Sequence, residues 1–417
     1  MKQLPRMIRI RQRFDSTCIE DPRGVARQAA GELLVGAPVA PGQTVAVTGS
    51  SRGIAHIADI LAGAVEALRK VGLEPFIVPA MGSHGGGTAE RQLAVLHHYG
   101  VTESHVGCPV RSQVETVEVG VTPDGIPLRI DKLAAEADHI LLVNRIKPHS
   151  HLIGPCESGL AKILLIGLGK PSGAAFYHRA FARLGFGQVF QSAVPVLVKR
   201  LSILGGLAIV ENAYDETCRI EPLRAAEILA REPALLEQSK RLMPTLPVDD
   251  IHVLVLDQIG KDISGAGMDP NVMGRDRPGP RSDVIFVRDL TPASEGNASG
   301  IGLADVTVKR LTDKMDWKAT FLNCATALHP HLARVPYAFD TDREALEACF
   351  TAVRTADPLA ARIVWVRSTL ALGELEVSEP LLGELAGRSN LEILGEPHPI
   401  AFRPDGSLVD AFDPPLA

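Results

Sequence analysis

The sequence lacks any uninterrupted apolar run of the roughly 18 to 20 residues that a membrane-spanning helix needs. Its first sixteen residues alternate basic and apolar side chains, so they also lack the continuous apolar core of a signal peptide. Cysteine is scarce: the six cysteines form no Cys-x-x-Cys pair and no spacing typical of a zinc site. Together these absences predict a cytoplasmic protein in a reducing compartment, without a membrane partner.

An excess of positive charge is absent as well. The chain has 43 Lys and Arg residues against 49 Asp and Glu residues, which gives a net charge of −6. No overall basic field is therefore available to gather nucleic acid or anionic lipid. We expect a small-molecule ligand and no nucleic acid, whereas the composition predicts no particular oligomeric state.

With 417 residues, the chain exceeds the size that a single hydrophobic core comfortably serves, which predicts two domains. The segment MPTLPVDD at residues 243–250 interrupts a helical pattern with two prolines and precedes a new apolar strand. We therefore expect an N-terminal domain over residues 1–247 and a C-terminal domain over residues 248–417. The last residues of the chain could pack back on the first domain.

Short apolar segments alternate with helical patterns along both halves of the sequence. Strands are expected at residues 44–48, 75–79, 139–144, 251–256, 283–287 and 362–366, and helices at residues 57–72, 89–98, 158–166, 304–314 and 343–355. This alternation predicts two α/β domains with mostly parallel sheets and a cleft between them. In such sheets, ligands bind in the loops beyond the carboxyl ends of the strands.

Two of these loops carry histidines. The first, residues 82–88, contains His84 followed by three glycines, so that backbone amides around Gly86 could approach a ligand. A flexible turn with a solvated histidine is the alternative interpretation. The second loop follows the strand at residues 139–144 and carries His149 and His151, which could form a metal pair or a catalyst with a helper.

The stretch that continues from this second loop to residue 178 combines charged and apolar residues. Lys162 lies in an apolar pattern, where an amine is costly to bury unless it is neutralised, paired or covalently used. It could also extend from the edge of a helix to water. His178 could be a core histidine or a nitrogen ligand to a transition metal such as nickel.

In the second half, Gln258 and Lys261 follow the strand at residues 251–256 and lead into a glycine-rich loop at residues 264–274. A loop of this length without periodicity is often functional, although a surface excursion fits the pattern equally well.

Taken together, these residues resemble the nickel-dependent lactate racemase family, the nickel-pincer hydroxyacid racemases and epimerases. The loop of Ser83, His84 and Thr88 is similar to the family's Gly-Thr-His loop, and Pro148–His149 is similar to its Pro-His step. Lys162 precedes a glycine-rich turn, and His178 follows it by sixteen residues, as in the family. The resemblance spans residues 40–400, but its specific motifs lie in the N-terminal half.

The chain departs from the family pattern in two places. Residues 48–52, TGSSR, stand where the family has an Asp-x-Thr-Arg turn, so Ser51 and Arg52 retain the hydroxyl and the cation while the acid is missing. Extra residues follow His149, and ESGLAK replaces the family's Ser-Gly-Gly-x-Lys segment. These differences indicate a divergent branch.

The resemblance implies a nickel-pincer nucleotide, pyridinium-3,5-bisthiocarboxylic acid mononucleotide with nickel, made by cofactor-assembly enzymes. Lys162 would join it as a thioamide, and His178 would be the fourth nickel ligand. Ser51, Arg52 and Gly86 would also contact the cofactor.

The implied reaction inverts the hydroxyl-bearing C2 of a small 2-hydroxy acid by reversible hydride transfer to the cofactor. His84 and His149 would be the two bases, with His151 as the reserve for His149. Arg52, Lys261 and Gln258 would bind the substrate, whose carboxylate suits a cation.

Two other functions fit the same residues. The histidines could hold zinc or iron directly in a metal-dependent hydrolase or lyase, which would need no covalent adduct. The chain could also be a non-catalytic carrier of a cofactor or small ligand, given the acid missing from residues 48–52.

Overall fold

The computed structural model describes residues 4–50 and 53–412. The chain divides into two compact units. The first unit is Asp15–Met243, and the second unit combines Met1–Phe14 with Pro244–Ala417. The division lies next to the prolines of the MPTLPVDD segment, while the N-terminal segment groups with the second unit.

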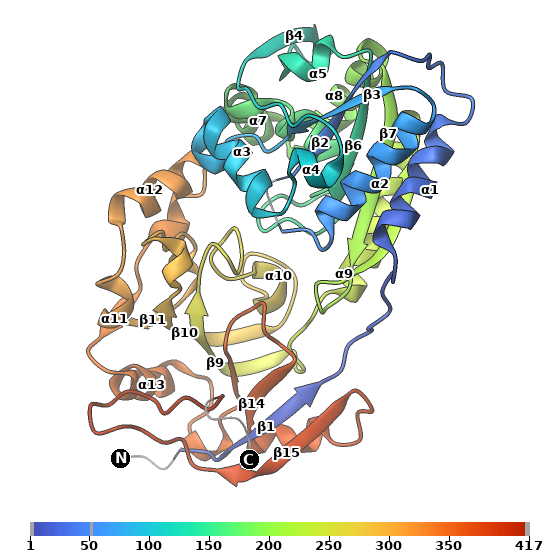
Figure 1. The fold of residues 1–417 in the computed structure, drawn as a ribbon. Coiled ribbons are helices and arrows are strands. Elements are labelled where there is room, and N and C mark those ends of the chain that lie inside the picture. Colours follow the sequence, from blue (N-terminus) through green and yellow to red (C-terminus); the bar gives the residue numbers. More distant parts are fainter. Residues whose placement is uncertain (1–3, 51–52, 413–417) are drawn as a thin grey trace. The chain divides into compact units, whose positions relative to one another are not determined.

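The first unit is built on a five-stranded sheet with the strand order β3-β2-β6-β7-β8 (Figure 1). The first four of these strands are parallel, and β8 is antiparallel to β7. The strands are β2 (Thr44–Gly49), β3 (Glu74–Pro79), β6 (His139–Arg145), β7 (Ile203–Glu211) and β8 (Thr217–Leu223), and a separate hairpin is formed by β4 (Thr116–Val121) and β5 (Pro127–Asp131).

Helices cover both faces of this sheet, because its inner strands are apolar on both sides. In β2, Val45 and Val47 pack into a core with α1 and α2, whereas Ala46 faces a second core that contains residues of α7, α8 and α9. The helices of the unit are α1 (Pro22–Leu34), α2 (Ile57–Lys70), α3 (Ala89–His98), α4 (Glu103–Val106), α5 (Lys132–Glu136), α6 (Leu160–Lys162), α7 (Lys170–Leu184), α8 (Phe186–Arg200) and α9 (Ile228–Leu242).

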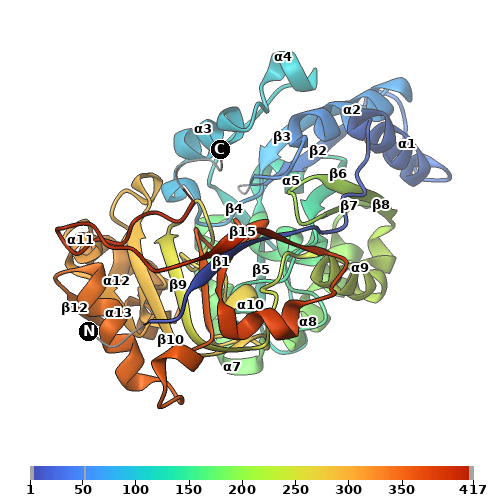
Figure 2. The same ribbon diagram turned by 90° about the horizontal axis from the view of Figure 1, so that it is seen from below.

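The second unit has an eight-stranded sheet with the order β12-β11-β10-β9-β13-β14-β1-β15. The strands from β12 to β13 are parallel, whereas β14, β1 and β15 pair antiparallel. Figure 2 shows β1 and β15 side by side. The strands are β1 (Met7–Gln12), β9 (Asp250–Ile259), β10 (Arg281–Leu290), β11 (Val306–Val308), β12 (Tyr337–Phe339), β13 (Ile363–Val366), β14 (Glu374–Ser378) and β15 (Leu391–His398).

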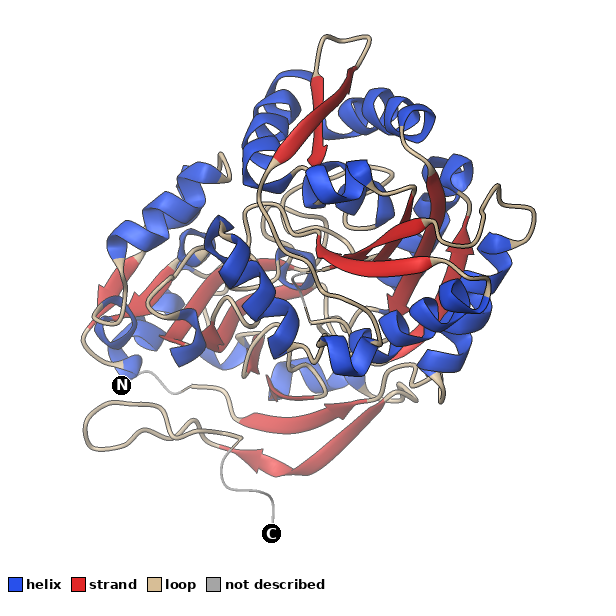
Figure 3. Ribbon diagram, turned by 45° about the horizontal axis from the view of Figure 1, so that its top comes forward, coloured by secondary structure: helices blue, strands red, loops and turns tan. Residues whose placement is uncertain are grey.

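Among the described residues, five α-helices accompany this second sheet, and Figure 3 distinguishes helices from strands. They are α10 (Pro270–Met273), α11 (Lys309–Thr312), α12 (Trp317–Thr326), α13 (Asp342–Ala352) and α14 (Leu382–Leu385). Within the described residues, no helix combines the length and the apolarity that crossing a membrane requires.

The predicted α/β class with mostly parallel sheets is confirmed. The helix expected over residues 304–314 is wrong, because residues 306–308 form strand β11 beside β10 and only Lys309–Thr312 are helical. The helix expected over residues 158–166 is instead a three-residue helix, α6, followed by a π-helix, η2 (Ile163–Gly167). The π-helix η2 lies next to the backbone of the loop after β3.

Candidate active site

The histidine-bearing loops of the first unit leave the same edge of its sheet. Strands β3, β2 and β6 are parallel neighbours, so the loops that follow them emerge together. His84 lies in the loop after β3, and His149 and His151 lie in the loop after β6. The loop after β2 carries Ser51 and Arg52, which lie outside the described residues.

The loop that carries His84 has a conformation that depends on glycine. Gly85, Gly86 and Gly87 have φ values of 64°, 66° and 70°, in the left-handed region that favours glycine. The side-chain amide of the buried Gln92, on α3, donates to the backbone carbonyls of Gly82, at 2.8 Å, and of His84, at 3.3 Å. The loop is therefore held by its backbone, while the His84 side chain is exposed.

The same loop lies against the turn that connects Lys162 to His178. The amide of Gly82 donates to the carbonyl of Gly167 at 3.1 Å. A Cβ atom on Gly167 would lie 2.6 Å from the carbonyl oxygen of Ala80, so only glycine permits this close approach. The structure thus brings the His84 loop next to the segment that the sequence marked for cofactor binding.

Lys170 stabilises this junction, and the sequence pattern did not predict its burial or its role. Its side chain is completely buried, its Nζ donates to the carbonyl of Pro79 at 2.5 Å, and it pairs with Asp131 at 2.8 Å. Burial lowers the pKa of the Lys170 amine, whereas the Asp131 carboxylate acts in the opposite direction. Its φ of 56° is unusual for a residue other than glycine, and the ion pair and the surrounding packing maintain it.

The loop after β6 is organised by a buried glutamate. Glu157 accepts a hydrogen bond from the amide of His149 at 2.8 Å. The Nδ1 atom of His149 accepts from the amides of His151 and Leu152, at 3.1 and 3.2 Å. Because Nδ1 is an acceptor in both bonds, the neutral His149 ring carries its proton on Nε2.

This loop also adjoins the segment that leads to Lys162. Lys147 and Ser158 exchange two backbone hydrogen bonds, of 2.8 and 3.1 Å. The side-chain amide of Asn144 donates to the carbonyl of Gly159 at 2.9 Å. The segment from Ser158 to Lys170 therefore borders both histidine loops.

Lys162 and His178 lie on consecutive elements of this segment. Lys162 ends α6 and is half-buried, so the amine that is fully buried in this region is that of Lys170. His178 lies in α7, is half-buried, and meets Phe181 edge to face with ring centroids 5.8 Å apart. The roles assigned to Lys162 and His178 stay predictions.

The buried polar atoms without a hydrogen-bond partner among the described residues include one after β2 and one on α3. These two are the Ser50 Oγ, at the carboxyl end of β2, and the Oε1 of Gln92, behind the His84 loop. A buried polar atom without a partner is costly, and a bound ligand can satisfy it. This edge therefore has the chemistry of a polar ligand site.

The residues predicted in the second unit lie at the end of β9. Gln258 is exposed near the carboxyl end of that strand, and Lys261 is half-buried in the loop after it. The Lys261 amine donates to the carbonyl of Gly265 at 2.7 Å, and its backbone amide donates to Ser294 at 2.9 Å. These bonds fold the loop after β9 against the loop after β10; substrate binding by Gln258 and Lys261 stays a prediction.

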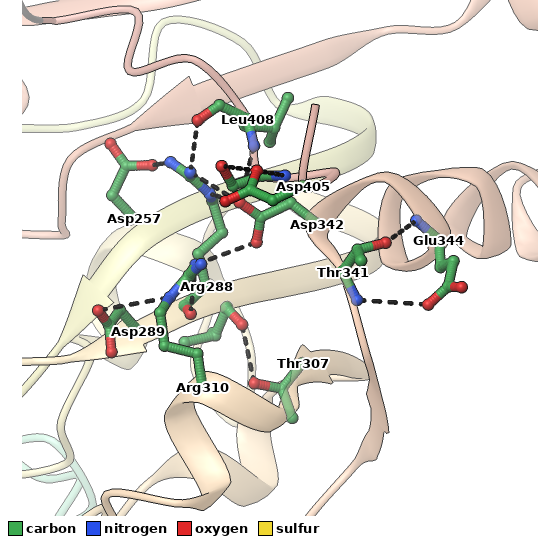
Figure 4. A network of polar contacts seen from close by, with 12 residues as sticks. Asp257, Arg288, Asp289, Thr307, Arg310, Thr341, Asp342, Glu344, Asp405 and Leu408 are labelled. Carbon is green, nitrogen blue, oxygen red and sulfur yellow. Dashed lines mark hydrogen bonds and ion pairs between the residues drawn. The ribbon is translucent and has the colours of Figure 1, made fainter. Parts of the chain in front are cut away.

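A polar network lies beside Gln258, at the same ends of β9 and β10 (Figure 4). Arg288 pairs with Asp257 and, at 2.9 Å, with Asp342, and it donates to the carbonyl of Leu408. Burial raises the pKa of Asp257, against the influence of Arg288. The network attaches the chain around Leu408 to the sheet, which is a structural role.

The donor set fits the implied cofactor. Within residues 4–50 and 53–412, no group of three or more His, Cys, Asp and Glu side chains is arranged to hold a metal ion. A pincer cofactor brings its own carbon and sulfur ligands, so the chain needs to supply one imidazole and one amine. His178 and Lys162 supply these two groups in the predicted roles.

In comparison with known proteins, residues 39–184 match the family model of the lactate racemase N-terminal domain. No curated protein matches the chain significantly.

Two solved structures share the fold at 15% sequence identity and a TM-score of 0.52. One is a protein from Thermotoga maritima, and the match covers 84% of this chain and 98% of that chain. The other is the lactate racemase apoprotein from Thermoanaerobacterium thermosaccharolyticum, with 87% of this chain and 99% of that chain covered. Residues 39–184 thus match the lactate racemase N-terminal domain, and the chain shares its fold with the lactate racemase apoprotein.

Proposed function

We propose that this protein is a racemase or epimerase that inverts C2 of a small 2-hydroxy acid with a nickel-pincer nucleotide. One observation carries the proposal: within the residues that match the lactate racemase N-terminal domain, the His84 loop and the His149 loop both border the segment that contains Lys162. Two imidazoles can thereby act on a substrate that is bound next to one attached cofactor.

Lys162 would attach the cofactor and His178 would bind its nickel, while Ser51, Arg52 and Gly86 would contact its nucleotide part. An amide formed at Lys162 removes the charge of a half-buried amine, which favours attachment at this position. When bound, this cofactor supplies a reversible acceptor for the hydride from C2. The assembly of such a group requires dedicated partner enzymes.

One of His84 and His149 would take the hydroxyl proton from one enantiomer, and the other would return a proton to form the opposite enantiomer. His84 is exposed on its loop and can approach a substrate directly. His149 can accept a proton at Nε2 only if the bonds from His151 and Leu152 to its Nδ1 open. If those bonds persist, His149 orients the hydroxyl by donating from Nε2, and His151 becomes the second base.

Arg52, Lys261 and Gln258 would bind the substrate carboxylate and its neighbouring oxygen. A guanidinium presents two parallel donors to a carboxylate, and an ammonium adds a point charge. The backbone bond from Lys261 to Ser294 fixes the start of the Lys261 loop, which favours a defined position for its amine.

The test is racemisation by protein that has been produced with the cofactor-assembly enzymes and nickel. Single enantiomers of 2-hydroxy acids carrying deuterium at C2 are incubated with it, and the products are resolved by chiral chromatography and mass spectrometry. We expect inversion with retention of the deuterium, because a hydride returns to the carbon it left. Nickel-loaded protein that inverts no hydroxy acid, or that exchanges the C2 deuterium with water, would contradict the proposal.

A further inference from the structure

Helix α9 lies beyond residues 39–184 and yet contacts the candidate site through a buried glutamate. Glu232 is 1% exposed, and helix α9 packs against β7 and α6. Neither the mechanism nor the sequence motifs account for a carboxyl group at this position. Because a buried carboxylate is costly, its contacts should explain why it is there.

The Glu232 carboxylate is directed at the backbone that leads into Lys162. Its Oε2 accepts from the amide of Ala161 at 3.0 Å, and the neighbouring amide of Leu160 and thiol of Cys156 act to lower its pKa. These amides begin α6, where no preceding helical carbonyl is available to them. Such a bond is stronger when the carboxyl group is ionised than when it is protonated.

The fit at this contact is tight. A Cβ atom on Gly159 would lie 2.3 Å from the Oε1 of Glu232, so residue 159 must be glycine for the carboxylate to reach the turn. Among the described residues, this Oε1 has no hydrogen-bond partner. The contact therefore holds one short piece of backbone, Gly159 to Lys162, in a single position.

The same helix also supports the loop of His149. Lys240, two turns after Glu232 on α9, pairs with Glu157 at 3.5 Å, and Glu157 accepts from the amide of His149. One helix thus supports the two segments that carry Lys162 and His149. Burial raises the pKa of Glu232 to about 7, while the bonds from Ala161 and Leu160 oppose this rise.

We infer that Glu232 is a positioning residue that fixes the turn of Gly159 to Lys162 and thereby directs the Lys162 amine for attachment of the cofactor. This inference rests on the proposed function. Its first consequence, order in the backbone around Lys162, concerns the protein without cofactor.

The experiment compares the wild type with Glu232→Leu, Glu232→Gln and Glu237→Leu in the full-length chain. Glu237→Leu is the surface control, because it makes the same change on α9 at a side chain that is 61% exposed; it removes the 2.8 Å pair of Glu237 with Lys240 but leaves Glu232 and its contact with Ala161 intact. Glu232→Gln retains an oxygen that can accept from Ala161. Leucine is apolar and fits a buried position without an unpaired charge, so Glu232→Leu should fold.

Two quantities are measured for each variant. The first is amide hydrogen exchange of the apoprotein in peptides covering residues 158–166, with peptides of β6 and β7 as the reference. The second is the fraction of chains with a covalent adduct, measured as intact mass after production with nickel and the cofactor-assembly enzymes. The first readout requires no cofactor and the second requires no turnover.

We expect Glu232→Leu to speed exchange at residues 158–166 about ten-fold and to lower the adduct fraction at least about five-fold. The reference peptides should be unchanged, Glu232→Gln should keep more than about half of the adduct, and Glu237→Leu should match the wild type. Unchanged exchange and adduct in Glu232→Leu would overturn the inference, and so would faster exchange throughout the first unit. If the wild type itself forms no adduct, the proposed function fails, and the exchange data still decide whether Glu232 orders the turn.

Discussion

At the residue scale, the buried pair of Lys170 and Asp131 connects the strand that leads to His84 with the turn that leads to His178. Lys170→Met would leave the Asp131 carboxylate buried without its cation. We expect the free energy of unfolding to fall by roughly 3 to 5 kcal/mol, as measured by urea denaturation. The double change Lys170→Met with Asp131→Asn should restore part of this loss; a single Lys170→Met variant as stable as the wild type would contradict the role of the pair.

The raised pKa of Glu232 leads us to expect that the free energy of unfolding depends on pH. This pKa is raised from 4.5 to about 7 on folding, so between these values the folded chain holds a proton that the unfolded chain has released. The contribution of Glu232 to the free energy of unfolding is fully present below pH 4.5 and is lost as the pH rises to about 7. Relative to Glu232→Gln, the wild type should therefore lose about 2 kcal/mol between roughly pH 5.5 and 8. Urea denaturation at both pH values checks this; a difference that is constant with pH would contradict it.

The sequence predicted the histidine loops but not the buried groups that hold them. His84, His149 and His151 follow apolar strands, and that position is visible in the order of residues. The burial of Lys170 and Glu232 arises from contacts with Pro79 and Ala161, which are 91 and 71 residues away in the chain. Such distant contacts leave no local pattern.

At the element scale, the junction between the His84 loop and the π-helix η2 depends on Gly167. A methyl group there would press against the carbonyl of Ala80, so Gly167→Ala should separate the two segments. We expect a loss of about 2 kcal/mol in the free energy of unfolding, measured by urea denaturation. Stability equal to the wild type would show that the junction tolerates a methyl group.

Gly31→Ala is the matched control for this change. Gly31 lies in α1, and a methyl group placed on it would meet no atom outside its own helix within 4 Å. Alanine is the better helix former, so this variant should gain about 0.5 to 1 kcal/mol in the same denaturation experiment. A loss of stability would contradict the open surroundings of Gly31.

Elements with strong local signals were predicted closely. The helix over residues 89–98 has the predicted bounds, and Thr88 caps it by accepting from the amide of Arg91. The π-helix η2 was not predicted, because its apolar residues fit an ordinary helix and its wide turn depends on distant contacts. The short strand β11 was read as part of a helix, since three residues carry little periodicity.

At the scale of the whole molecule, the alternation of strands and helices predicted the α/β class. The pairing of strands from the two ends of the chain could not be predicted from the sequence. Strand β1 lies between β14 and β15, so Ile8 pairs with Val377 and Ile10 with Ile393. No turn links these strands, and a sequence pattern cannot specify a partner more than 350 residues away. The cleft expected between the two domains also stays a prediction.

The proposed function depends most on the covalent attachment of a nickel-containing nucleotide to Lys162. Its direct test is the intact mass of the full chain produced with nickel and the cofactor-assembly enzymes, alongside Lys162→Arg and Lys170→Arg. We expect an adduct with the mass of the pincer nucleotide in the wild type, located on Lys162 by peptide mapping and absent from Lys162→Arg, whereas folded Lys170→Arg retains it. A wild-type chain of unmodified mass, or an adduct that persists in Lys162→Arg, would contradict it.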